Sequence, residues 1–263
     1  MVAVVGLAVA TVLGGVVAWQ ATGGGAQQQT ARIDPKADQY LKAMSTYLAG
    51  LKTYSVQVEE FIDEVGDDGL KIQLSNQRKL SVSRPDMVFG ETSGDTANCL
   101  FYYNGKTVTV YDRSQKTYAT EKVPGTIDGM LDDLHDRFDT QQTLADFMFS
   151  DPYKVLMENV QSGTYVGLHN VGTTKCHHLA FRQKSLDWQI WIDAGTEPLP
   201  RKFQITFKRE VDQPQYTALI HHWEMNPKLE SSMFEFKAPE SVRKVDFLDR
   251  HAKIEPVKKA AGK

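Results

Sequence analysis

Much of the chain between residues 53 and 225 alternates apolar with polar side chains at every second position, and this alternation limits the fold more than any other feature. Near its start, the apolar residues of one predicted strand are Tyr54, Val56 and Val58. Such a strand has one wet and one dry face. The runs follow one another across short turns, and Asn104-Gly105 is the strongest hairpin signal among them. Strands joined so closely pair antiparallel, because a parallel pair needs a long crossover.

Helical spacing interrupts the strands. Asp34-Pro35 is typical of a helix start, and Gly50 marks the end of that helix. In the middle of the chain, residues 127–138 and 144–148 fit helices, and Asp151-Pro152 opens a third. We therefore predict an α+β fold: a strongly curved antiparallel β-sheet of about ten to eleven strands, covered by the N-terminal helix and the helical insert. Because so wide a sheet must curl or split, we expect a half-open barrel.

We expect the two ends of the chain to lie outside the folded domain, which we place at residues 31–249. Residues 1–18 carry no charged side chain. Such a run is either the core of a signal peptide or a short membrane anchor, with a flexible leader to residue 30. Gly24 and Ala26 suit cleavage after Ala26. Residues 250–263 are mainly basic and predict a disordered tail, and either end could contact a membrane.

Composition excludes several classes of protein. The 263 residues are 41% hydrophobic and carry a net charge of −3, so no basic field favours nucleic acid. The two cysteines, Cys99 and Cys176, are too few for a four-cysteine zinc site. In an exported protein they form either a disulfide or two buried free thiols, and the sequence leaves both open.

Motifs for catalysis are weak. His177-His178 and His221-His222 suggest a metal site, but adjacent residues on a strand face opposite sides, so we expect ordinary strand histidines and no metal. A nucleophile elbow, a phosphate-binding glycine loop and a pair of catalytic carboxylates do not occur in the context they need. We therefore expect no catalytic residues, no cofactor and no enzyme activity.

Two segments resemble a known family. The strand Arg84–Phe89 and the hairpin Phe101–Asp112 resemble the arginine-proline strand and the aspartate-glycine-lysine hairpin of the periplasmic lipoprotein carriers LolA and LolB, with Asn104 in place of the aspartate. The arginine that those carriers have at the cavity mouth is matched here only by Arg84. This resemblance implies a half-open β-barrel with a helical lid and an apolar cavity.

A second set of motifs is similar to a family of predicted periplasmic proteins of unknown function, thought to share the carrier fold. These motifs are Asp187–Asp193, Pro198–Lys202 and His222-Trp223, together with Cys176–Phe181. The two resemblances cover about residues 34–248 and imply a protein in the periplasm of a Gram-negative bacterium.

The apolar face of the predicted sheet and insert is the candidate ligand site. Its members should point inward, where they form either a solid core or the lining of an acyl-chain cavity. They are Val56, Val58, Leu70, Ile72, Met130, Leu134, Phe147, Met148, Trp188, Ile190, Ile192, Phe203, Ile205 and Phe207.

The function we predict is non-catalytic binding of a lipid, a lipoprotein acyl chain or another hydrophobic ligand inside the half-barrel. The alternative is an envelope protein-interaction or sensory module with a filled core and no ligand. The predicted partners are accordingly a lipid or lipoprotein acyl group, or an envelope protein.

Overall fold

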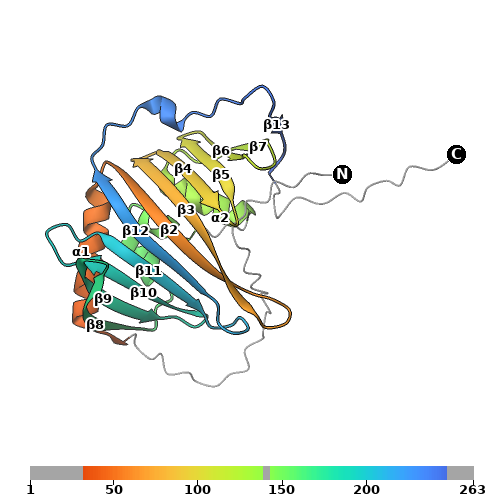
Figure 1. Cartoon of the computed structure of the whole chain (residues 1–263). Coiled ribbons are helices and arrows are strands. Elements are labelled where there is room, and N and C mark those ends of the chain that lie inside the picture. The colour runs from red at the N-terminus through yellow and green to blue at the C-terminus, as the bar shows by residue number, and fades with distance from the viewer. Residues whose placement is uncertain (1–31, 139–142, 248–263) are drawn as a thin grey trace, which may run out of the picture.

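The computed structural model describes residues 32–138 and 143–247, and Figure 1 shows a wide sheet with few helices. The first elements are β1 (Arg32–Ile33), α1 (Pro35–Gly50), β2 (Thr53–Val65), β3 (Lys71–Ser83), β4 (Met87–Gly94), β5 (Asn98–Asn104), β6 (Thr107–Asp112) and β7 (Thr117–Lys122). The helical insert follows, with α2 (Ile127–Phe138), the 3-10 turn η1 (Ala145–Phe147) and α3 (Pro152–Met157). The last elements are β8 (Ser162–Val171), β9 (Thr174–Arg182), β10 (Leu186–Asp193), β11 (Pro200–Phe207), β12 (Gln215–Met225), the 3-10 turn η2 (Ser231–Phe234) and β13 (Arg243–Lys244).

All thirteen strands of the described residues form one sheet, in the order β1-β8-β9-β10-β11-β12-β2-β3-β4-β5-β6-β7-β13. Neighbours pair antiparallel except at the two edges, where β1 and β13 pair parallel with β8 and β7. The predicted α+β class and curved antiparallel sheet are confirmed. The predicted strand count is too low, because the two-residue edge strands are too short to leave an alternation in the sequence. The sheet is open rather than a closed barrel, since β1 and β13 lie at opposite edges.

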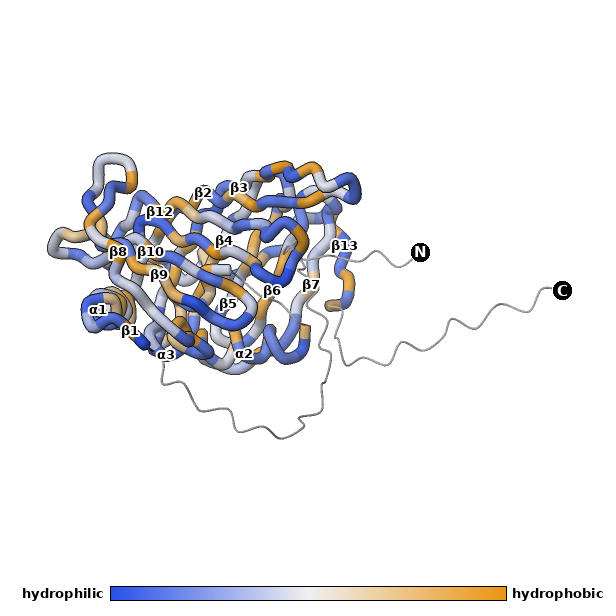
Figure 2. The backbone as a smooth tube through the Cα atoms, turned by 90° about the horizontal axis from the view of Figure 1, so that it is seen from below, coloured by the Kyte–Doolittle hydropathy of each residue, from blue (hydrophilic) through white to orange (hydrophobic). Residues whose placement is uncertain are grey.

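The helices lie on one side of the sheet, which arches over them (Figure 2). Helix α1 begins as predicted, because the Asp34 carboxylate accepts a hydrogen bond from the Lys36 backbone N–H at 2.8 Å. Its stripe of Leu41, Met44 and Leu48 is fully buried, and the helix packs against β8, β9 and β10. Burial of this stripe fixes α1 over one half of the sheet.

One predicted helix is wrong. Residues 144–148 form only the single 3-10 turn η1. Leu144 has φ of 76°, in the left-handed region, so Leu144 cannot itself belong to a right-handed helix, and only Ala145–Phe147 form a short turn after it. Apolar spacing at Leu144, Phe147 and Met148 reflects burial of a turn rather than a helix face.

The predicted terminal segments, residues 1–30 and 250–263, lie outside the described residues. No helix within the described ranges is long and apolar enough to cross a membrane.

The concave side of β9, β10 and β11 is packed solid, and we call it the filled half. Phe181 stacks on Trp188 with ring centroids 4.1 Å apart, and Trp188 meets Phe203 at 5.9 Å. From the insert, Phe147 packs edge-on against Phe203 at 5.4 Å. The side chains of the filled half are Leu179, Phe181, Trp188, Ile190, Ile192 and Phe203, all at most 4% exposed.

Candidate ligand pocket

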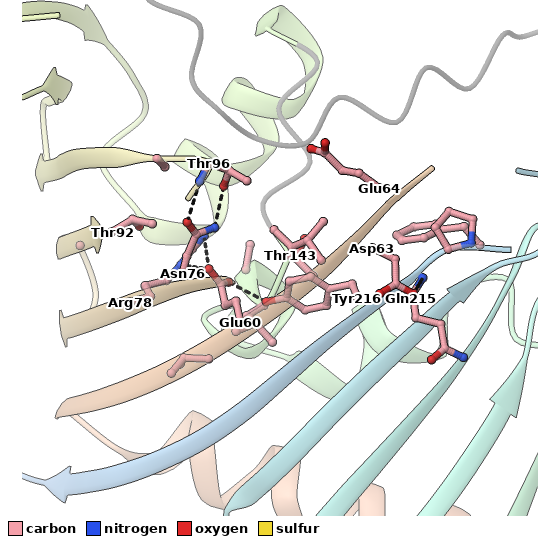
Figure 3. A pocket seen from close by; sticks show the side chains of 18 of the residues that line it. Glu60, Asp63, Glu64, Asn76, Arg78, Thr92, Thr96, Thr143, Gln215 and Tyr216 are labelled. Carbon is pink, nitrogen blue, oxygen red and sulfur yellow. Dashed lines mark hydrogen bonds and ion pairs between the residues drawn. The ribbon is translucent and has the colours of Figure 1, made fainter. Parts of the chain in front are cut away.

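A pocket of about 930 Å³ occupies the concave side of β2, β3, β4 and β5, which we call the pocket half. Such a volume lies near the upper end of the range for small-molecule sites, about 300–1,000 Å³. Strands β2 to β5 supply its floor, and β12 and the segment Leu144–Met148 supply further walls. Figure 3 shows its polar side chains.

An apolar row crosses the floor from strand to strand. Register pairs Val56 with Leu80, Leu80 with Gly90, Gly90 with Phe101 and Phe101 with Val110, and all five residues line the pocket. Gly90 has no side chain at the middle of this row, and a Cβ built there would meet only the Phe101 Cβ, at 3.5 Å. The missing side chain contributes to the space above the row.

The next row is polar, although it lies on the same face. It runs from Val58 to Arg78, Thr92 and Cys99, two residues further along each strand, or about 7 Å away. Arg78 donates from Nε and Nη2 to Glu60 Oε2, each at 3.3 Å. The Tyr216 hydroxyl donates to Glu60 Oε1 at 2.6 Å. Figure 3 shows this triad between β3, β2 and β12.

Burial and pairing set the charge of the triad. Burial lowers the pKa of Arg78 and the Glu60 carboxylate raises it, with a net upward shift, so Arg78 stays protonated. Burial, together with Glu60, raises the pKa of Tyr216 well above its usual value, which keeps its O–H as a donor. Burial also raises the pKa of the Cys99 thiol. The polar row therefore presents hydrogen-bond donors, and the buried carboxylate beside it, Glu60, already accepts from Arg78 and Tyr216.

The pocket opens at the β2–β3 turn and the β11–β12 loop, where its lining residues are exposed. Gly66 and Asp67 line it from the turn, and Val211 lines it from the loop. Lys71 Nζ donates to the Asp212 carbonyl at 2.7 Å and joins these two tips. The rim carries mostly acidic side chains, which are Asp63, Glu64, Asp67 and Glu210 against Arg209.

The predicted site residues fall into three groups. The pocket is lined by five of them, Val56, Val58, Phe147, Met148 and Phe207. Seven pack in the core outside the lining, where Ile205 is partly buried and the others are buried: Met130, Leu134, Trp188, Ile190, Ile192, Phe203 and Ile205.

The third group contradicts the prediction. Leu70 is 62% exposed and Ile72 is 46% exposed, so neither is buried in a core or cavity. Leu70 lies in the turn, before β3 begins at Lys71. Ile72 has the correct parity but sits at the tip of the hairpin, beyond the side chains that could cover it.

Sequence reasoning missed the polar members of the pocket, Glu60, Arg78 and Tyr216. A signal was present, because Glu60 continues the parity of Val56 and Val58, and Arg78 continues that of Leu80. A charged residue on the dry face of a strand needs a partner. Two such residues on adjacent predicted strands indicate a buried pair.

The histidines are held in aromatic contacts. His177 stacks on Tyr40 of α1 at 3.5 Å, and His178 stacks on Trp191 at 4.0 Å, on the other face of β9. Burial lowers the pKa of both imidazoles. Across the described part of the chain, no group of three or more His, Cys, Asp or Glu side chains could hold a metal ion.

The disulfide alternative is wrong, because Cys99 and Cys176 are both free. They lie on β5 and β9, which six strands separate in the sheet order. A disulfide needs Cα atoms about 4.4–6.8 Å apart, and strands are spaced by about 4.8 Å each. Burial raises the pKa of Cys176 to about 11, so its thiol is protonated.

Arg84, the residue matched to the carrier arginine, does not line the pocket. It donates from Nη1 to the Met148 carbonyl at 2.7 Å and from Nη2 to the Phe149 carbonyl at 3.3 Å. Arg84 thus fixes the segment whose side chains Phe147 and Met148 form a pocket wall.

Fold and pocket together define an α+β protein whose open, curved antiparallel sheet is filled on one half and hollow on the other. The sequence profile of the family described as "Predicted periplasmic protein (DUF2092)" matches residues 37–248, so the chain belongs to this family. The predicted family and the predicted periplasmic location are thereby confirmed. No curated protein matches the sequence.

Solved structures with similar chain traces include three bacterial proteins. An uncharacterised conserved protein from Thermus thermophilus has 10% identity and a TM-score of 0.47, covering 80% of this chain and 99% of its own. The Mycobacterium tuberculosis lipoprotein LppX has 11% identity and a TM-score of 0.41, covering 74% and 98%. A LolA superfamily protein from Nitrosomonas europaea has 8% identity and a TM-score of 0.35, covering 76% and 97%.

Proposed function

We propose that this protein binds a hydrophobic chain, such as the acyl chain of a lipid or lipoprotein, inside the pocket and performs no covalent chemistry on it. The observation that carries the proposal is the apolar row from Val56 to Val110. Together with Phe147 and Met148, this row lines one pocket of about 930 Å³. Each methylene buried there contributes about 0.8 kcal/mol, so a chain of ordinary length gains enough to bind.

The arrangement of the titratable groups supports binding rather than catalysis. Glu60 is the buried carboxylate of the pocket, and its two oxygens accept from Arg78 and Tyr216. Its side chain is 2% exposed. A carboxylate so enclosed is poorly placed to take a proton from a ligand.

Native mass spectrometry tests the proposal on protein expressed with its own leader and purified gently from the periplasm. We expect an added mass in the lipid range that is lost on strong activation. The variant Gly90→Leu fills the hollow above the apolar row, and it should fold normally while losing most of the adduct. A bare mass for the wild type, and no uptake of any added lipid, would overturn the proposal.

A second candidate is an envelope protein-interaction module, favoured by the exposed apolar side chains at the two tips. Val211 is 78% exposed and Leu70 is 62% exposed, and the Lys71–Asp212 hydrogen bond joins their loops. Exposed apolar residues of this kind mark interaction sites when they gather. Loss of a partner on Leu70→Ser/Val211→Ser, with lipid uptake intact, would support this function.

A further inference from the structure

We infer that the pocket selects an uncharged acyl ester, whose carbonyl oxygen accepts a hydrogen bond from Arg78, over a free fatty-acid anion. This inference deepens the proposed function and rests on it. It follows from the donors of the polar row, from the neutralisation of Arg78 by Glu60, and from the charge of the rim.

Arg78 has a donor to spare. Its Nε and Nη2 both donate to Glu60 Oε2, while Nη1 has no hydrogen-bond partner among the described residues. The Arg78 side chain retains 27% of its exposure and lines the pocket, whereas that of Glu60 retains 2%. Both residues line the pocket, but the two Glu60 oxygens already accept from Arg78 and Tyr216, so Arg78 supplies the donor that a ligand can use.

The position of Arg78 suits a group at the end of a chain. It lies one row, or about 7 Å, from the apolar row of Val56, Leu80 and Gly90. A chain lying along the apolar part of the pocket thus places its first polar atom beside Arg78. Guanidinium groups donate strongly to carbonyl, carboxylate and phosphate oxygens.

Charge decides among these acceptors. Glu60 already neutralises Arg78, so a ligand anion would add an uncompensated charge in a partly buried site. An anion must also pass the rim, where Asp63, Glu64, Asp67 and Glu210 outnumber the cations Arg209 and Lys71. An ester carbonyl accepts the same hydrogen bond, and because it is uncharged it neither adds a charge to the site nor is repelled by the rim. The ester can belong to a free acylglycerol or to the diacylglyceryl group of a lipoprotein.

The test is displacement of the uncharged apolar dye N-phenyl-1-naphthylamine from the full-length protein. The competitors are 1-palmitoylglycerol, a dipalmitoylated lipopeptide and palmitate. We expect at least one ester to displace the dye at a concentration about tenfold lower than palmitate does. The ester that binds more tightly identifies the source of the group.

The decisive variant is Glu60→Gln/Arg78→Met. It removes both charges together, because Arg78→Met alone would leave a buried carboxylate unpaired. The amide oxygen introduced by Glu60→Gln can still accept from Tyr216. The matched control is Glu91→Gln/Arg113→Met, which removes a salt bridge of 2.9 Å from the other face of the same sheet. We expect the folded pocket variant to lose the tenfold preference for an ester over palmitate, and the control to keep it.

The outcomes separate the two proposals. If neither dye nor any competitor binds the wild type, the hydrophobic pocket itself fails. If the dye binds but palmitate displaces it as well as both esters do, the selection of an ester is wrong. It is also wrong if the pocket variant, shown to be folded by circular dichroism, keeps the full preference.

Discussion

The two halves of the sheet are made from the same kind of strand, yet one is solid and the other hollow. On the filled half, the inward side chains from Leu179 to Phe203 are large and apolar, with α1 packed against β9 and β10 and Phe147 packed against Phe203. On the pocket half, the inward positions include Gly90, Arg78 and Glu60, and the cover is the short segment Leu144–Met148. The difference shows that the capacity to bind is set by what fills the concave face rather than by the curvature of the sheet.

Energetically the filled half should dominate stability. Its side chains are at most 4% exposed and in contact with one another. The pocket half keeps a buried ion pair and an unfilled volume, which contribute little to stability. The same kind of mutation is therefore expected to change the free energy of unfolding by different amounts in the two halves.

The largest effect is expected for Ile190→Ala, in the filled half. Ile190 is fully buried, and the neighbouring rings cannot collapse into the space it leaves. We expect a loss of about 2–5 kcal/mol in the free energy of unfolding. Urea denaturation measures it, and dye binding at low temperature should remain near the wild-type value. If Ile190→Ala lowered the free energy of unfolding by less than a surface substitution does, the filled half would not be packed solid.

A matched pair of insertions compares a position beside the filled half, Ala218, which the register pairs with Phe203, with a position in the pocket half, Gly90. Ala218 is fully buried on β12, outside the pocket lining, so Ala218→Leu should destabilise by about 1–3 kcal/mol through overpacking. Gly90→Leu places its side chain in the pocket and should leave the free energy of unfolding nearly unchanged. Equal destabilisation of both variants, measured by urea titration, would contradict the comparison.

The same contrast explains what the sequence could predict. Alternation placed Val56, Val58, Trp188 and Ile190 correctly on the concave face, because burial of one strand face is a local, two-residue signal. It could not tell pocket wall from core, since that depends on which helix covers each strand. Leu144 shows the limit for the insert, where a left-handed residue overrides helical spacing.

Acidification should lower the free energy of unfolding by less than Ile190→Ala does, through His177 on β9 of the filled half. Burial lowers the pKa of His177 below its usual value of 6.5, where it stacks on Tyr40 under α1. The folded state then binds fewer protons than the unfolded state, so stability is lost as pH falls through about 6.5. Arg78, whose pKa is raised, stays charged throughout.

The measurement is the free energy of unfolding at pH 7.5 and at pH 5.5, for the wild type and for His177→Gln. We expect the variant to lose less stability than the wild type between these two values. An equal or larger loss in the variant would assign the pH dependence to other groups.

The smallest effect is expected where the apolar pattern continues to the exposed tip of the β2–β3 hairpin. Leu70→Ser/Ile72→Ser changes two apolar residues that share the alternation of the core but are 62% and 46% exposed. Because neither is covered, the free energy of unfolding should change by less than about 0.5 kcal/mol per site. Thermal and urea denaturation measure it beside Ile190→Ala. A loss approaching that of Ile190→Ala would show that the hairpin tip is buried in solution, and would put the mouth of the pocket elsewhere.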